Sequence, residues 1–344
     1  MVKIVLDCFG GDLSPDSNVQ GAIEYFNENK DVYIIMTGKE DILRQKLQAY
    51  TYDTSRLEIQ NADEVISLEE KPTEAIRRTN TSMVRAFDIV KKDDSIAGMV
   101  SLGSTGALLV GTFLRIGRLK NVLRPAFCPI IPNLYGGRVA ICDSGANAEC
   151  TPQYLRQFAV MGSRYLEAFC GVKNPKVGLL NIGVEKEKGD RLRQEAYELL
   201  ENTECVNFQG NMESRELLTG KFDLIVCDGF SGNVLLKSTE GACFEMLRML
   251  KGVMTSSTKN KLGALLLKNS IMEQKELLNY QNYGGAVMLG AKKIVVKGHG
   301  NGNATSVKKC LDQVYTMQMG DINGKIEQDL AKLAEASSQA KQGE

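Results

Sequence analysis

The sequence has no excess of charge of either sign: 42 lysines and arginines balance 42 aspartates and glutamates over 344 residues. A dedicated nucleic-acid-binding protein is normally basic, so this balance argues against that class. No apolar run approaches the ~20 residues needed to cross a bilayer. The first residues also lack the long apolar core and the cleavage site of a signal peptide. We therefore expect a cytoplasmic protein that binds no nucleic acid.

The cysteines lack any paired spacing. There are nine, scattered along the chain without a C-x-x-C pair, so neither a zinc ribbon nor a redox motif is indicated. Several lie inside apolar stretches such as LIVCD and VAICD, which favours small buried thiols in a reducing cytosol. A nucleophilic cysteine would need a nearby base. The only histidine, His299, lies far away in the sequence, although the fold could bring it close.

Strand-like and helix-like segments alternate along the chain, and 43% of the residues are hydrophobic. The predicted strands are Val2–Asp7, Val32–Thr37, Leu57–Asn61, Ile96–Leu102, Arg138–Asp143, Lys176–Ile182, Cys205–Gln209, Leu224–Asp228 and Lys293–Val296. The predicted helices are Asn18–Asn27, Lys39–Ala49, Thr81–Lys92, Gly103–Arg118, Pro152–Phe169, Asp190–Glu201, Val234–Met254 and Thr305–Met317. This order predicts a doubly wound α/β fold, with a mostly parallel sheet between helices on both faces.

Five loops rich in glycine and polar residues follow predicted strands: DCFGGD, SLGSTGA, CDSGANAEC, LNIGVEKEKGD and CDGFSGNV. The carboxyl ends of parallel strands line the ligand crevice of an open sheet, and backbone N–H groups at helix starts bind anions. Each loop alone could be an ordinary tight turn, but five in one sheet predict a site for phosphate or a phosphorylated ligand. The candidate residues are Gly10, Gly11, Asp12, Gly103, Ser104, Thr105, Gly106, Asp143, Asn147, Asp228 and Gly232.

At these loops the sequence resembles the acyl-ACP:phosphate acyltransferases of bacterial phospholipid synthesis (the PlsX family). The resemblance rests on LDCFGGDLSPD, NADEVI, TSMVRAFDIV, SLGSTGALLVG, RPAF, SGANAECTPQYLRQFAVMGS, VGLLNIGVEKEKGD, FQGNMESREL, DLIVCDGFSGNVLLKSTEG, NYGGAVMLG and GHGNGNA. These stretches run in order from Leu6 to about Ala304. Leu13 stands where the family usually has histidine, Ser104 where it has asparagine, and Ser144 where it has valine.

The resemblance implies an isopropylmalate-dehydrogenase-like fold, with a three-layer α/β/α body, a cleft between two lobes, and a homodimer. It also implies that an acyl group passes from acyl carrier protein to inorganic phosphate, and that a membrane glycerol-3-phosphate acyltransferase uses the acyl phosphate. No metal and no organic cofactor are implied. We assign residues 1–335 to a single catalytic domain, with a helical amphipathic excursion near 254–280, and residues 336–344 to a polar tail.

Phosphate is already an anion, so such a reaction needs a cation and oxyanion-stabilising donors more than a strong base. Lys188 is the first candidate for the cation, although Lys186 competes and a solvated surface lysine is the plain alternative. Asn233 could donate its amide to the thioester or to phosphate, or could simply cap the helix that follows. Asp228 could hold Lys188 or a loop N–H. His299, between glycines after a strand, could donate to phosphate or protonate the leaving thiol.

The segment Lys259–Tyr280 combines apolar and basic residues, with a predicted tip at Leu262, Leu265, Leu266 and Leu267. Such a pattern suits a helix lying on an anionic membrane surface, although a dimer or core helix explains the leucines equally well. The family is peripherally membrane-associated, which favours the membrane. Acyl carrier protein is acidic, and candidate basic docking patches are Arg77–Arg78 and the Arg115, Arg118, Lys120 and Arg124 cluster.

Three other functions remain open. A phosphotransacetylase-like enzyme would use acyl-CoA and would need a patch that cradles a nucleotide, which we do not find. A decarboxylating dehydrogenase of the same fold would need a metal-carboxylate cluster with a spacing that these loops lack. A non-catalytic scaffold that binds acyl carrier protein or membranes is disfavoured by the presence of Lys188, Asn233 and His299.

Overall fold

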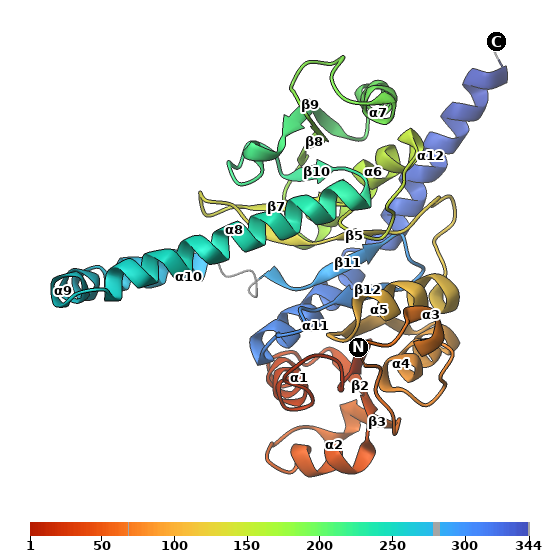
Figure 1. Cartoon of the computed structure of the whole chain (residues 1–344). Coiled ribbons are helices and arrows are strands. Elements are labelled where there is room, and N and C mark those ends of the chain that lie inside the picture. Colours follow the sequence, from red (N-terminus) through yellow and green to blue (C-terminus); the bar gives the residue numbers. More distant parts are fainter. Residues whose placement is uncertain (68, 278–282, 343–344) are drawn as a thin grey trace.

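The computed structural model describes residues 1–67, 69–277 and 283–342. Its lower part in Figure 1 is built around a seven-stranded sheet. The strand order is β3 (Leu57–Asn61), β2 (Val32–Gly38), β1 (Val2–Asp7), β4 (Ile96–Ser101), β12 (Ile294–Lys297), β11 (Ala286–Leu289) and β5 (Ala126–Cys128). The first five strands run parallel, and β11 pairs antiparallel with both of its neighbours.

Helices cover both faces of this sheet because its strands are apolar on both sides. In β1, Ile4 and Leu6 pack in one apolar cluster with α1 (Asp16–Glu28) and α11 (Ala304–Met319), whereas Val5 packs in another with α4 (Ser82–Lys92). Strands buried on both faces belong to the interior of a layered α/β fold. The remaining elements of this part are α2 (Glu40–Leu47), the 3₁₀ turn Thr54–Arg56, α3 (Pro72–Ala75), α5 (Thr105–Gly111) and the π turn Thr112–Ile116.

A second, five-stranded sheet forms the upper part of the molecule. Its order is β6 (Ile130–Pro132), β7 (Arg138–Cys142), β10 (Leu224–Val226), β8 (Lys176–Asn181) and β9 (Asn207–Glu213), with only β6 antiparallel. α6 (Pro152–Cys170) packs on β7 and β10, and α7 (Arg191–Glu201) on β8 and β9. The 3₁₀ turn Ser214–Glu216 follows β9, and α12 (Ile322–Gln342) packs against α6.

The α/β class with mostly parallel strands and covering helices is confirmed. The expectation that all five glycine loops follow strands of one sheet is wrong, because the strands divide into two sheets. The sheets meet where Ser144 donates its N–H to the Phe127 carbonyl at 3.1 Å. The loops therefore still gather around one junction. The short strands β5, β6 and β11 were not predicted.

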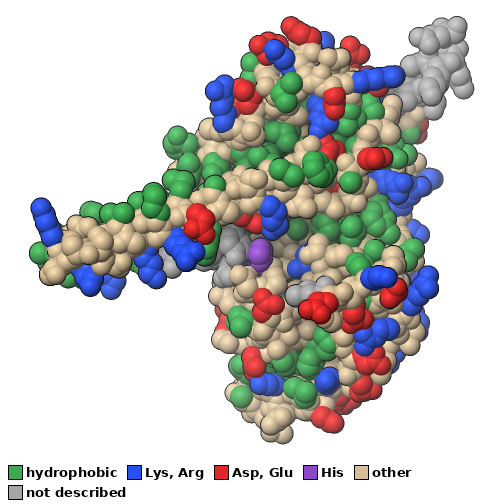
Figure 2. All heavy atoms as spheres, viewed as in Figure 1, with side chains coloured by type: hydrophobic (Ala, Val, Ile, Leu, Met, Phe, Trp, Pro, Cys, Tyr) green, Lys and Arg blue, Asp and Glu red, His purple; other side chains and the backbone are tan. Residues whose placement is uncertain are grey.

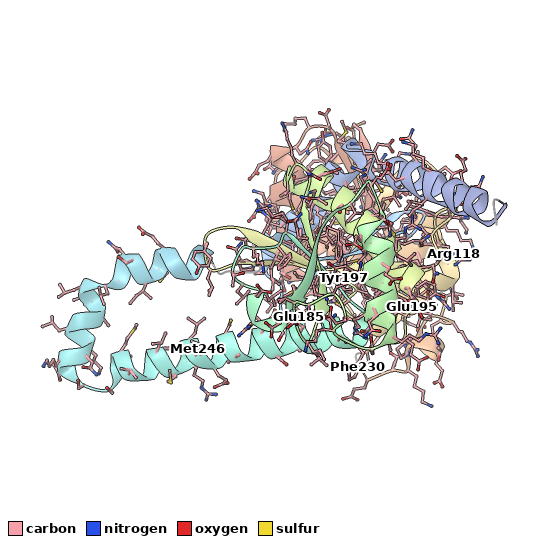
Figure 3. All side chains as sticks on the ribbon, turned by 90° about the horizontal axis from the view of Figure 1, so that it is seen from above. Arg118, Glu185, Glu195, Tyr197, Phe230 and Met246 are labelled. Carbon is pink, nitrogen blue, oxygen red and sulfur yellow. The ribbon has the colours of Figure 1, made fainter. Side chains whose placement is uncertain are left out.

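A helical arm leaves the body between the two parts. It consists of the outer half of α8 (Gly229–Thr255), then α9 (Thr258–Leu266) and α10 (Lys268–Leu277), and it projects far from both sheets (Figures 1 and 3). Of the predicted excursion 254–280 and tail 336–344, residues 278–280 and 343–344 lie outside the described residues. Among the described helices, none has the length and apolarity required to cross a membrane.

Candidate active site

The loops after β1, β4 and β12 form one cluster at the carboxyl edge of the seven-stranded sheet. Gly10 lies so close to the β4 loop that an added Cβ would come within 2.5 Å of the Gly103 nitrogen. Gly11 has a φ of +97°, which favours glycine. Asp12 donates its N–H to the Gly300 carbonyl at 2.7 Å. The structure therefore brings Gly10, Gly11, Asp12, Gly103 and Gly300 together, through backbone contacts that need small residues.

The β4 loop continues into α5, and its candidate residues support that helix. Ser104 is buried and accepts the N–H of Ala107 at 3.4 Å, so its hydroxyl acts as the helix N-cap. Thr105 is exposed in the first turn. Gly106 makes room for Pro72, whose ring carbon would lie 2.6 Å from a Cβ at this position. These contacts favour a structural role for Ser104 and Gly106.

Asp143 organises the loop after β7. Its carboxylate is buried and accepts the backbone N–H groups of Phe127, Gly145, Ala146 and Asn147, together with the Asn147 side-chain amide, at 2.7–3.2 Å. Burial raises the pKa of Asp143, and these donors oppose the rise. Asn147 also donates to the Pro125 carbonyl at 2.8 Å. Asp143 and Asn147 are thus committed to holding the loop.

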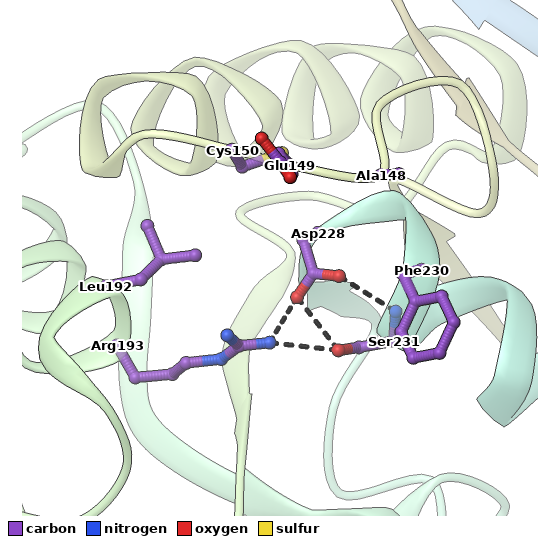
Figure 4. A pocket seen from close by; sticks show the side chains of 8 residues that line it. All are labelled: Ala148, Glu149, Cys150, Leu192, Arg193, Asp228, Phe230 and Ser231. Carbon is purple, nitrogen blue, oxygen red and sulfur yellow. Dashed lines mark hydrogen bonds and ion pairs between the residues drawn. The ribbon is translucent and has the colours of Figure 1, made fainter.

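Asp228 joins α7 to the start of α8 (Figure 4). It caps α8 by accepting the Ser231 N–H and hydroxyl, each at 2.8 Å, and it pairs with the Arg193 guanidinium, which also donates to Ser231. Of the two partners expected for Asp228, the structure shows the loop N–H and not Lys188. Because Asp228 is the cap, the alternative role of Asn233 as the N-cap is wrong. Sequence reasoning missed Arg193.

A hollow of about 620 Å³ opens beside this ion pair, lined by Ala148, Glu149, Cys150, Leu192, Arg193, Asp228, Phe230 and Ser231 (Figure 4). Arg193 is shared between Asp228 and Asp190, and Glu149 adds a further carboxylate. The surplus of carboxylates disfavours phosphate there. Burial raises the pKa of the Cys150 thiol to about 12, so it stays protonated and is a poor nucleophile.

The two lysines after β8 have different surroundings. Lys186 pairs with Glu201 at 2.6 Å and lies 5.2 Å from the centre of the Tyr197 ring. Lys188 is exposed, its aliphatic stem lies against Gly183, and the Asn181 side chain donates to its carbonyl at 3.0 Å. Within the described part of the chain, no salt bridge to the Lys188 ammonium is found. Of the two lysines, Lys188 is therefore the one whose ammonium is not paired with a carboxylate of the described residues. None of the contacts described here links Lys188 to His299.

The start of α8 bridges the two groups of loops. Asn233 is exposed and faces the β7 loop, since a Cβ on Gly145 would lie 3.5 Å from its Nδ2. Lys237 and Glu240 follow at helical spacing, and both act electrostatically on His299 in the β12 loop. Partial desolvation lowers the pKa of His299, although the residue keeps exposed surface, and this favours the neutral imidazole. Figure 2 shows a hollow beneath α8 with the histidine side chain, in purple, inside it.

Lys297 is a second residue that sequence reasoning missed. It ends β12, two residues before His299, and its ammonium donates to the carbonyls of Leu102, at 3.4 Å, and Gly298. A lysine directly after three apolar strand residues and before Gly-His-Gly was the signal that could have pointed to it.

In the described residues, no group of three or more histidines, cysteines or carboxylates is placed to hold a metal ion.

The chain is similar in sequence to known proteins over nearly its whole length. The family model described as fatty acid synthesis protein matches residues 2–324. A phosphate acyltransferase of Clostridium tetani is 42% identical over 332 residues, covering 96% of this chain and 99% of that protein. One from Fusobacterium nucleatum is 43% identical over 311 residues, covering 90% and 93%.

Solved structures share the fold at low sequence identity. A phosphotransacetylase from Streptococcus pyogenes is 16% identical with a TM-score of 0.63, covering 92% of this chain and 94% of that one. The EutD phosphotransacetylase from Staphylococcus aureus is 17% identical with a TM-score of 0.58 and the same coverage. The full-length matches at 42–43% identity decide the family, and the chain belongs to the phosphate acyltransferase family of fatty acid synthesis proteins.

Proposed function

We propose that this enzyme transfers a fatty acyl group from acyl carrier protein to inorganic phosphate, in the hollow beneath α8. The observation that carries the proposal is the 42% identity, over 96% of the chain, to a protein named phosphate acyltransferase. The hollow adds physical support, because Lys237 on α8 and His299 in the β12 loop interact electrostatically there. The reaction needs no redox chemistry, and the proposal includes neither a metal nor an organic cofactor.

In the proposed step, an oxygen of hydrogen phosphate attacks the thioester carbonyl carbon. The new C–O bond forms as the C–S bond breaks, and the phosphate proton ends on the leaving thiolate, giving acyl phosphate and the free thiol of the carrier. His299 suits this proton movement because its lowered pKa favours the neutral imidazole, which is the form that takes up a proton. The Asn233 amide is a donor for the developing oxyanion.

The carrier is the acidic partner in this proposal. Among the basic patches, Arg78 is paired with Glu64 and Glu70, and Arg115 with Asp88. Arg118 and Arg124 instead line a hollow of about 420 Å³ together with Phe113, Leu123 and Tyr154. Two guanidinium groups beside apolar walls favour an acidic helix with an apolar anchor. A membrane-bound glycerol-3-phosphate acyltransferase would use the acyl phosphate to make glycerophospholipid.

The direct test is to incubate the purified protein with palmitoyl-ACP and phosphate and to measure acyl phosphate. Phosphate-dependent product and free carrier thiol in equal amounts would support the proposal. Turnover with palmitoyl-CoA but not with palmitoyl-ACP would replace it with a phosphotransacetylase-like function. Absence of product with both thioesters would favour a scaffold that binds the carrier without catalysis.

Lys188→Ala is expected to lower kcat/KM for acyl-phosphate formation by about 100-fold, the usual cost of losing one charge-stabilising group. Lys186→Ala is the matched control, since Lys186 lies in the same loop with its ammonium paired to Glu201, and an exposed ion pair contributes little to stability. Steady-state kinetics with palmitoyl-ACP measure both. Equal activities in the two variants would remove Lys188 from the mechanism and leave the charge role to the cations of the hollow beneath α8.

We propose further that the arm carries a homodimer contact and a peripheral membrane contact. Its exposed apolar side chains on α8 include Phe244, Met246, Leu247, Met249, Leu250 and Val253. At the tip, Leu262, Leu265, Leu266 and Leu267 are exposed by 57–81%, close to Lys259, Lys261 and Lys268. Basic and apolar groups together suit a surface of anionic lipid.

The double variant Leu265→Gln/Leu266→Gln is expected to bind phosphatidylglycerol vesicles at least about tenfold more weakly, because two leucines would no longer enter the lipid. Vesicle co-sedimentation measures the change. Leu134→Gln is the control, since Leu134 is 57% exposed on the body, far from the tip in sequence. Unchanged vesicle binding with an altered oligomeric state would assign these leucines to the dimer instead.

A further inference from the structure

Lys297 lies at the carboxyl edge of the seven-stranded sheet, next to the end of the central strand β4. It ends β12, pairs in register with Ser101 at the end of β4, and is half-buried. Its ammonium donates to two backbone carbonyls, those of Leu102 and Gly298. Carbonyl oxygens orient an ammonium but leave its charge uncompensated, and an ammonium has three donors. One donor of the ammonium therefore remains for another group.

The charged groups around Lys297 come from several elements. Those that act on it are Asp7 at the end of β1, Asp12 in the next loop, Cys310 on α11 and Lys237 on α8, and it acts in turn on His299. Asp7 is already engaged with the Ser101 hydroxyl at 2.7 Å. Burial is the largest influence, and it lowers the pKa of Lys297 to about 8. Asp7 and Asp12 act on Lys297 electrostatically, but among the described residues neither forms a salt bridge with its ammonium.

Lys237 is the cation on the opposite wall. It lies one helical turn beyond Asn233 on α8, and it forms a salt bridge with Glu240 at 2.7 Å. Its repulsion is among the causes of the lowered pKa of Lys297. An anion between two like charges removes their repulsion and gains attraction from both. The hollow that also holds His299 offers such a place.

We propose that Lys297 and Lys237 form the binding site for inorganic phosphate, with Lys297 as its fixed, half-buried cation. This inference rests on the proposed acyl transfer and locates the phosphate between the β12 loop and α8, within reach of His299 and Asn233. Lys188, on the loop after β8, then lies outside the phosphate site.

The test is Lys297→Met, with kinetics at varied phosphate. The KM for phosphate is expected to rise at least about tenfold, as for loss of a charge-assisted contact, with the KM for palmitoyl-ACP unchanged. Lys293→Met is a matched control: at the other end of β12, the Lys293 ammonium also donates to two carbonyls, of Asp94 at 2.8 Å and Ile96 at 2.9 Å. Equal phosphate KM values in the two variants would overturn the proposal.

The pH profile gives a readout that a merely structural lysine would not move. Because the pKa of Lys297 is about 8, its ammonium is present at pH 7 and is lost as the pH rises toward 9. Between pH 7.5 and 9, the phosphate KM of the wild type and of Lys293→Met should therefore increase. Over the same range, the phosphate KM of Lys297→Met should increase less, because this variant has no ammonium to lose at that position. Parallel profiles in all three proteins would contradict a role for Lys297.

Equilibrium binding separates this inference from the proposed function. Inorganic phosphate should raise the thermal unfolding midpoint of the wild type and of Lys293→Met, and should leave that of Lys297→Met unchanged. A wild type that is stabilised by phosphate but does not consume palmitoyl-ACP would support the phosphate site and overturn the proposed acyl transfer. A Lys297→Met protein that phosphate stabilises as fully as the wild type would overturn the site alone.

Discussion

Replacing Gly232 by alanine is expected to lower the free energy of unfolding by about 3 kcal/mol, at the upper end of overpacking costs. A Cβ at this position would come closer than 3.0 Å to the carbonyl oxygen of Asp143, and Cβ atoms essentially never approach so near. The obstacle is backbone of the β7 loop, which the bonds to Asp143 hold in place, so it cannot turn aside. Urea unfolding followed by circular dichroism measures the loss.

Gly241→Ala is the matched control, because Gly241 lies on the same helix, α8, with no atom within 4 Å of an added Cβ. In a helix interior, alanine is more favourable than glycine by up to about 1 kcal/mol. The two glycine-to-alanine changes should therefore shift stability in opposite directions. A Gly232→Ala protein as stable as the wild type would mean that α8 can move away from the β7 loop.

The sequence allowed most of the parallel core to be predicted, because strands such as β1, β2 and β4 are runs of apolar residues buried on both faces. The short strands β5, β6 and β11 left no comparable signal. Each has three or four residues, and β5 and β11 pair across more than 150 residues of sequence. Their pairing is antiparallel and depends on how the two sheets meet, which local periodicity does not encode.

For the site, glycine-rich loops after strands were a usable signal, and the structure gathers them at one junction. The missed side chains are those whose role depends on distant contacts. Arg193 lies in a charged stretch and reads as a solvated residue until the fold places Asp228, 35 residues away, beside it. Lys237 likewise reads as a surface residue of a long helix until the β12 loop lies opposite. Composition cannot show such pairings.

Asp143→Asn is expected to cost about 3 kcal/mol of stability, through buried donors left without an acceptor. One carboxylate oxygen accepts the N–H groups of Phe127, Gly145 and Ala146, and the other accepts two donors of Asn147. An asparagine would turn an NH₂ group toward one of these sets, so donors would face donors. Thermal and urea unfolding measure the effect.

Asp7→Asn is the comparison, because Asp7 is an equally buried carboxylate at the end of a strand. Its close partner is the Ser101 hydroxyl at 2.7 Å, and its backbone donor, Phe9, lies at 3.3 Å. A hydroxyl can rotate to accept from the new amide, so the expected cost is about 1 kcal/mol. Backbone N–H groups cannot rotate, and this difference is why Asp143 should be the more sensitive residue.

The Asp143→Asn variant also tests whether the β7 loop shapes the reaction site. Gly145 of this loop faces the Asn233 amide, so a displaced loop should lower kcat for acyl-phosphate formation, while the phosphate KM, set at the β12 loop, should change little. Asp7→Asn should shift the phosphate KM instead, because the Asp7 carboxylate acts electrostatically on Lys297. If Asp143→Asn lost stability but kept its full kcat at a temperature where it stays folded, Asp143 would support the fold alone, and Asn233 would not depend on the loop that it faces.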